Sequence, residues 1–154
     1  IGLGYIGLPT AAILASRGIT VIGVDVSENV VDTVNKGEIH IVEPGLDILV
    51  REVIKNGYLK AVSKPVSADV FIIAVPTPFK GEHQPDLNFI RSAIESIAPL
   101  LEKGNKVILT NHHQSCMSSS GYVQRTISQY VCSSSREMNS LCLTYKFENT
   151  PVVE

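Results

Sequence analysis

Three glycines near the start of the chain constrain its fold more than any other feature. Residues 1–8 read Ile-Gly-Leu-Gly-Tyr-Ile-Gly-Leu, so Gly2, Gly4 and Gly7 have the spacing G-x-G-x-x-G. In a strand–turn–helix unit the first glycine permits a tight turn, the second lets the backbone approach a pyrophosphate, and the third lets the helix pack close to the sheet. The spacing therefore predicts a turn that leads into a helix and holds a dinucleotide.

The residues that follow favour the same interpretation. Residues 9–15 are apolar and predict a buried helix, which Arg17 and Gly18 end with a cation and a glycine. The amide groups of Tyr5 and Ile6 would then lie at the amino terminus of a helix, unpaired and directed at phosphate groups.

An acidic residue follows the next predicted strand. Residues 19–24 are rich in β-branched side chains and predict a buried strand, and Asp25 stands at its carboxyl end. A carboxylate there accepts hydrogen bonds from ribose hydroxyls and repels a 2′-phosphate, which favours NAD over NADP. The alternative is a glycine-rich turn in an unrelated α/β domain, with Asp25 merely capping the next helix.

Strand and helix patterns alternate from residue 1 to about residue 109 and predict an α/β fold, a Rossmann-type parallel sheet with flanking helices. Because the chain opens at Ile1, already at the turn, we expect a sheet truncated at its first strand. Ser27 is the expected cap of the helix that follows Asp25. The further elements expected are helices over residues 28–36, 47–54 and 89–102, the last kinked or split at Pro99, and strands over residues 59–62, 70–75 and 106–109.

A proline-flanked threonine follows the strand over residues 70–75. The turn Val75-Pro76-Thr77-Pro78 should lie at the carboxyl edge of the sheet, where ligands bind in open α/β folds. Thr77 offers a hydroxyl that the two prolines hold in place. The turn is either one wall of a nicotinamide pocket, with Thr77 bonded to the cofactor, or a plain proline-stiffened loop, and the pattern leaves both open.

The composition bears on partners and compartment. The formal net charge is −2 and the pI is about 6.1, so nothing predicts a basic surface for nucleic acid. No run of about 18 apolar residues predicts a membrane span. The cysteines, Cys116, Cys132 and Cys142, lack metal-ligand spacing, so we expect no metal site, and their pattern fits a cytoplasmic protein.

The composition changes after Leu109. Residues 110–154 are rich in serine and contain all the cysteines, and no aspartate occurs after Asp86. We therefore expect an NAD-binding Rossmann domain over residues 1–109 and an atypical Ser/Cys-rich tail over residues 110–154. One hypothesis for the tail is a frameshifted reading frame.

Four motifs, in this order, resemble the UDP-glucose/GDP-mannose dehydrogenase family. They are the glycine motif through Pro9, Asp25, residues 37–46 (Gly-Glu-Ile-His-Ile-Val-Glu-Pro-Gly-Leu) and the turn at residues 75–78. The resemblance implies oxidation of the C6 alcohol of a nucleotide sugar to a carboxylate, with two molecules of NAD, for surface polysaccharide biosynthesis. Residues 37–46 and 75–81 look most like members that oxidise UDP-N-acetylmannosamine.

By the same resemblance, the cofactor contacts fall on Tyr5, Ile6, Asp25 and Thr77. Where family members carry a Glu-Ser-Thr-type segment, this chain has Thr110-Asn111-His112-His113. The family's catalytic lysine and nucleophilic cysteine have no counterpart here, so no catalytic residue is assigned. Full-length members form homodimers, which leaves the state of this chain open.

We therefore expect at best weak NAD binding and no turnover from this chain alone. The alternatives are a non-catalytic NAD-binding module and an inactive gene fragment.

Overall fold

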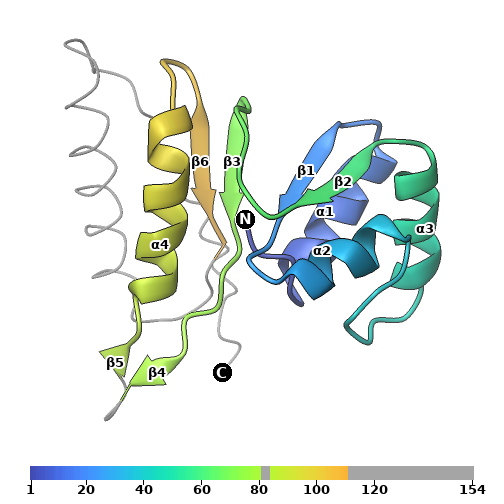
Figure 1. The fold of residues 1–154 in the computed structure, drawn as a ribbon, viewed down its shortest axis with the longest axis horizontal. Helices are drawn as coiled ribbons and strands as arrows, with labels where there is room; N and C mark the ends of the chain where they lie inside the picture. The colour runs from blue at the N-terminus through green and yellow to red at the C-terminus, as the bar shows by residue number, and fades with distance from the viewer. Residues whose placement is uncertain (81–83, 111–154) are drawn as a thin grey trace, which may run out of the picture.

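The computed structural model describes residues 1–80 and 84–110, in which helices and strands alternate (Figure 1). The helices are α1 (Gly7–Ser16), α2 (Glu28–Asn35), α3 (Leu46–Lys55), α4 (Asn88–Ile97) and the short 3-10 helix η1 (Ala98–Leu100). The strands are β1 (Val21–Val24), β2 (Leu59–Val62), β3 (Val70–Ile73), β4 (Phe79–Lys80), β5 (Gln84–Pro85) and β6 (Lys106–Leu109). Apart from Thr110, the predicted tail, with its three cysteines, lies outside the described residues.

The predicted helices and parallel strands are confirmed, with local differences at their ends. Strand β1 begins two residues later than expected because the amide of Ile19 still bonds to Leu14, at the end of α1. The last long helix is split as predicted, with α4 ending at Ile97 and Pro99 inside η1. The β4–β5 hairpin was not predicted, since strands of two residues leave no periodic pattern.

The sheet consists of two parallel pairs, β1 with β2 and β3 with β6, and residues 1–3 lie between them (Figure 1). The nitrogen of Ile1 donates to Ile72 O at 2.6 Å, and the amide of Ala74 donates to Ile1 O at 2.8 Å. On the other side, Gly2 N donates to Val24 O at 2.7 Å. The spatial order is therefore β2, β1, residues 1–3, β3, β6, a Rossmann order in which the central strand is represented by its last residues.

Two hydrophobic clusters stabilise the described chain. The first joins α1, α2 and α3 to β1 and β2, and the second joins α4 to β3 and β6. Leu3 is buried in the first cluster, whereas Ile1 packs against the second. Residues 1–3 therefore connect the two halves both through the backbone and through apolar side chains.

A side chain from α2 covers the free edge of β2. The amide group of Asn35 donates to Ala61 O and accepts from Ala61 N, both at 2.9 Å. Such an edge would otherwise expose unpaired backbone groups. Replacing Asn35 by alanine should lower the free energy of unfolding by about 1–3 kcal/mol, because both backbone groups lose a partner. Urea denaturation of Asn35→Ala and of Asn29→Ala, on the same helix, measures this; an equal loss in both variants would contradict it.

Candidate dinucleotide site

Gly2 forms the first bend of the turn over residues 2–7, which we call the glycine turn. Its φ is +89°, a left-handed conformation that favours glycine. A Cβ atom on Gly2 would lie 2.7 Å from the carbonyl oxygen of Ala74, just beyond β3. The end of β3 therefore packs so closely against the turn that both conformation and space require glycine.

Gly7 and Gly4 differ in what surrounds them. A Cβ atom on Gly7 would overlap the carbonyl oxygen of Gly2, so helix α1 can begin there only without a side chain. A Cβ atom on Gly4 would meet no atom of the described residues within 4 Å. Protein packing thus accounts for Gly7 but not for Gly4. An open face over Gly4 is what close approach of a pyrophosphate to the backbone requires, so the turn fits a dinucleotide.

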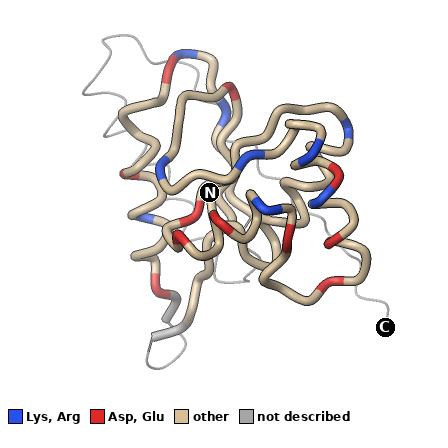
Figure 2. The backbone as a smooth tube through the Cα atoms, turned by 45° about the vertical axis from the view of Figure 1, so that its right-hand side comes forward, with Lys and Arg blue, Asp and Glu red and all other residues tan. Residues whose placement is uncertain are grey.

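The amino terminus of α1 faces the same turn. Its earliest helical hydrogen bond runs from Leu8 N to Gly4 O at 3.0 Å, so the amides of Tyr5 and Ile6 precede the helical bonding pattern. The first turn of α1 carries no acidic residue. Such a terminus attracts anions through its amides and its helix dipole. Figure 2 shows that the Lys and Arg residues are scattered over both halves of the described chain.

Asp25 links the glycine turn to the loop after β1. Its Oδ2 accepts from Leu3 N and its Oδ1 from Ser27 N, both at 2.9 Å. Ser27 occupies the N-cap position of α2, but its hydroxyl makes no capping bond, which corrects the expected side-chain cap. Each carboxylate oxygen has a second lone pair, so Asp25 can still accept from ribose hydroxyls.

Thr77 follows the segment in which the chain passes from the β1–β2 pair of the sheet to the β3–β6 pair. The chain passes from residues 1–3 to β1 and β2 and then returns to β3, so the carboxyl ends of residues 1–3 and β3 form the switch point at which open α/β sheets bind ligands. Thr77 is half-buried there, in the loop after β3. Its contact with a cofactor stays a prediction.

Thr110 also lies at this edge, although the sequence pattern assigned it to the tail. Its hydroxyl and its amide both donate to Ile73 O at 3.1 Å. The only sequence feature that could have indicated a role for Thr110 is its place immediately after the strand β6.

Glu43 is exposed in the loop before α3, and Gly45, with φ +78°, occupies the N-cap position of that helix. The described residues contain no group of three or more His, Cys, Asp or Glu side chains suited to a metal ion.

A parallel sheet with a glycine turn, an open helix terminus and an aspartate at the next strand end defines a dinucleotide-binding domain. The sequence matches the UDP-glucose/GDP-mannose dehydrogenase family, NAD binding domain, over residues 1–136. The chain belongs to this family, and NAD is the cofactor of the family's matching domain.

Curated relatives cover the first part of the chain. It is 67% identical over 110 residues to a UDP-N-acetyl-D-mannosamine dehydrogenase of Campylobacter jejuni, which covers 71% of this chain and 27% of the relative. It is 60% identical over 109 residues to the enzyme of that name from Escherichia coli (strain K12), covering 71% of this chain and 26% of the relative. The chain thus spans about a quarter of the length of these relatives.

Solved structures agree on the fold. A UDP-N-acetyl-mannosamine dehydrogenase from Staphylococcus aureus superposes with a TM-score of 0.78 at 39% identity, covering 84% of this chain and 31% of that one. A UDP-D-ManNAc dehydrogenase from Pyrococcus horikoshii gives 0.79 at 35% identity, covering 85% and 31%.

Proposed function

We propose that the chain binds NAD at the carboxyl edge of its sheet, as the cofactor-binding part of a nucleotide-sugar dehydrogenase. The observation that carries this is the open space over Gly4 beside two glycines that packing requires. The residues proposed to contact NAD are Gly2, Gly4, Tyr5, Ile6, Gly7, Asp25 and Thr77.

Each of these residues has a distinct part in holding the cofactor. The amides of Tyr5 and Ile6 donate to the pyrophosphate, and Asp25 accepts from the adenosine ribose. The hydroxyl of Thr77 orients the nicotinamide side. Bound NAD supplies the hydride acceptor, whereas the base and the thiol nucleophile that a two-step oxidation needs have no assigned residue in this chain.

The proposed reaction of the whole protein is the oxidation of the C6 alcohol of UDP-N-acetylmannosamine to the uronic acid, for surface polysaccharide synthesis. The names of the relatives at 67% and 60% identity support this substrate. No helix among the described residues is long and apolar enough to cross a membrane. We propose a cytoplasmic enzyme that is a homodimer at full length.

The proposed domain division is residues 1–109 for cofactor binding and residues 110–154 for the atypical tail. A frameshift after Leu109 would account for the change in composition. Sequencing the gene tests this: a one-base shift that restores a Glu-Ser-Thr segment supports it, and an unbroken region without such a frame contradicts it.

For this chain alone we expect weak NAD binding and no turnover. Calorimetric titration with NAD measures the first, and absorbance of NADH in the presence of UDP-N-acetylmannosamine measures the second. NADH production by this chain would overturn the expected inactivity. Absence of NAD binding by the folded chain would instead favour the alternative of an inactive gene fragment.

A further inference from the structure

Helix α3 ends in a pair of residues, Asn56 and Gly57, that the proposed NAD site does not use. Asn56 is the C-cap residue of α3, and Gly57 follows it with φ +76°. The amide of Gly57 donates to Ile54 O at 3.0 Å. The amide of Tyr58 donates to Val53 O at the same distance of 3.0 Å. These two bonds around a left-handed glycine form a Schellman motif, which satisfies the last carbonyls of a helix and which we call the α3 cap.

An asparagine that precedes a glycine can lose its side-chain amide to attack by the main chain. The nitrogen of Gly57, after giving its proton to hydroxide, attacks Cγ of Asn56. A C–N bond forms, the bond from Cγ to Nδ2 breaks, and ammonia leaves with a proton from water, which restores the hydroxide. Water then opens the resulting ring at either of its two C–N bonds, which gives aspartate or isoaspartate. Glycine favours ring closure because it has no side chain to obstruct it.

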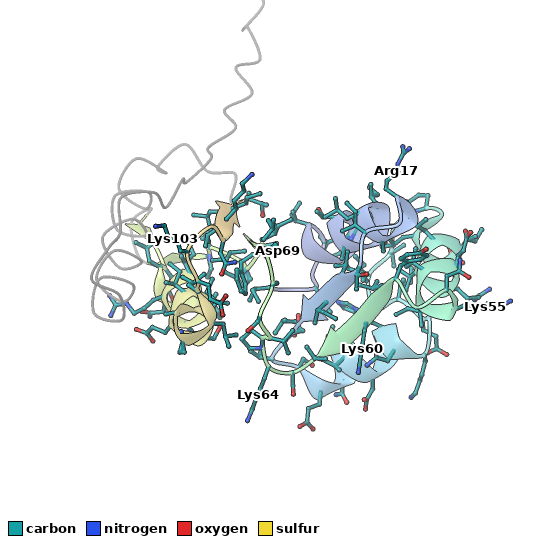
Figure 3. All side chains as sticks on the ribbon, turned by 90° about the horizontal axis from the view of Figure 1, so that it is seen from above. Arg17, Lys55, Lys60, Lys64, Asp69 and Lys103 are labelled. Carbon is teal, nitrogen blue, oxygen red and sulfur yellow. The ribbon has the colours of Figure 1, made fainter. Side chains whose placement is uncertain are left out.

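The surroundings of the α3 cap leave this reaction open to solvent. Asn56 and Gly57 are both exposed, and a Cβ atom on Gly57 would meet no described atom within 4 Å. Figure 3 shows the side chain of the preceding residue, Lys55, extending away from the rest of the described chain. Hydroxide and water can therefore reach both reacting atoms.

The folded conformation nevertheless holds the two reacting atoms apart. The ψ of Asn56 is −3°, which places the nitrogen of Gly57 beside the nitrogen of Asn56 and away from the Asn56 side chain. Ring closure needs rotation about this bond, and the same rotation breaks the bond from Gly57 N to Ile54 O. It also carries Tyr58 N away from Val53 O. The reaction therefore requires the α3 cap to open, and a local opening of this kind costs less free energy than global unfolding.

We propose that Asn56 is a deamidation site that reacts through transient opening of the α3 cap, and that its isoaspartyl product weakens the junction between α3 and β2. Isoaspartate adds one carbon to the main chain, so the amides of Gly57 and Tyr58 can no longer both reach the carbonyls of the helix. Tyr58 O also accepts from Val21 N at 2.8 Å, and the next residue, Leu59, begins β2 opposite Val21. The modification therefore loosens the pairing of β2 with β1.

Peptide mass spectrometry of the folded chain, kept at mildly alkaline pH, tests the proposal. The mass gain of an amide-to-acid conversion should appear at Asn56, whereas Asn29 and Asn105, which precede valine and lysine, should stay unchanged. A blocked peptide with the sequence of residues 53–59 should convert at least about tenfold faster, because it has no cap to open. Conversion of the folded chain as fast as the peptide, or conversion at Asn29 before Asn56, would overturn the proposal.

Hydrogen exchange at the Gly57 amide measures the opening of the α3 cap independently. Low concentrations of urea that leave the chain folded should accelerate exchange at Gly57 and conversion of Asn56 by the same factor. A chain whose Gly57 amide exchanges while Asn56 never converts would contradict the proposal. Asn56→Gln, whose longer side chain would have to close a larger ring, should keep the cap and lose the conversion. Conversion of that variant as fast as the unmodified chain would contradict the assigned chemistry.

The effect of the product on the fold is measured by comparing two forms of equal charge. Asn56→Asp places a carboxylate at the carboxyl end of α3, where the helix dipole disfavours it, but keeps the length of the main chain. The isoaspartyl chain, separated from the aspartyl product by chromatography, carries the same charge on a longer main chain. It should therefore unfold at a lower urea concentration than Asn56→Asp, and equal midpoints would contradict the weakened junction between α3 and β2.

The isoaspartyl chain should also bind NAD more weakly than Asn56→Asp. The end of β2 holds Asp25 through the bond from Asp25 N to Val62 O at 3.2 Å, so a loosened β2 displaces the proposed ribose acceptor. This readout alone rests on the proposed function. The mass gain at Asn56 and the urea midpoints are measured without NAD, so failure of either inference is recognised separately.

Discussion

Gly7→Ala should lower the free energy of unfolding by about 3 kcal/mol or more and abolish NAD binding. The new methyl group would overlap the carbonyl oxygen of Gly2, which is backbone and cannot rotate away. Relief requires either the start of α1 or the glycine turn to move, and the turn is where the pyrophosphate is proposed to bind. Urea denaturation and calorimetric titration with NAD measure the two effects.

Gly4→Ala is the matched control for this prediction. No described atom lies within 4 Å of the added methyl group, so stability should change by no more than about 0.5 kcal/mol. NAD affinity should nevertheless fall at least about tenfold, because the methyl group holds the phosphates away from the amides. A Gly4→Ala chain that binds NAD normally would show that the open space is not the pyrophosphate site.

Asp25→Asn should lower both stability and NAD affinity. The carboxylate accepts from Leu3 N and Ser27 N, and an amide in its place can accept from only one of them while its NH₂ group faces the other. The loss of that bond should cost about 1–3 kcal/mol of unfolding free energy. NAD affinity should fall about tenfold or more as a ribose acceptor is lost.

The control for Asp25→Asn is Asp32→Asn on α2, which removes the same charge from an exposed position. This variant should leave the free energy of unfolding and the free energy of NAD binding each unchanged within about 0.5 kcal/mol. Thermal unfolding and calorimetric titration with NAD measure the two. Equal behaviour of the two variants would mean that Asp25 acts only through net charge, against the proposed contact.

The sequence predicted those parts of the fold that local patterns determine. The glycine spacing, the β-branched runs and Pro99 each fix local backbone geometry, and the corresponding turn, parallel strands and split helix are present. The hydrogen bonds that Asp25 accepts from the amides of Leu3 and Ser27 could not be predicted in this way, since both partners contribute only their backbone. The same is true of Ala74, whose carbonyl explains Gly2, because that contact depends on how distant segments meet.

Titration of the isotope-labelled chain with NAD and then with NADP, followed by nuclear magnetic resonance, tests the central claim most directly. If the glycine turn and Asp25 form an NAD site, NAD shifts the amide signals of Gly4, Tyr5 and Ile6 saturably. NADP, whose 2′-phosphate meets the Asp25 carboxylate, then binds at least about tenfold more weakly. Saturable shifts that spare these amides, or NADP binding as tight as that of NAD, would contradict the account.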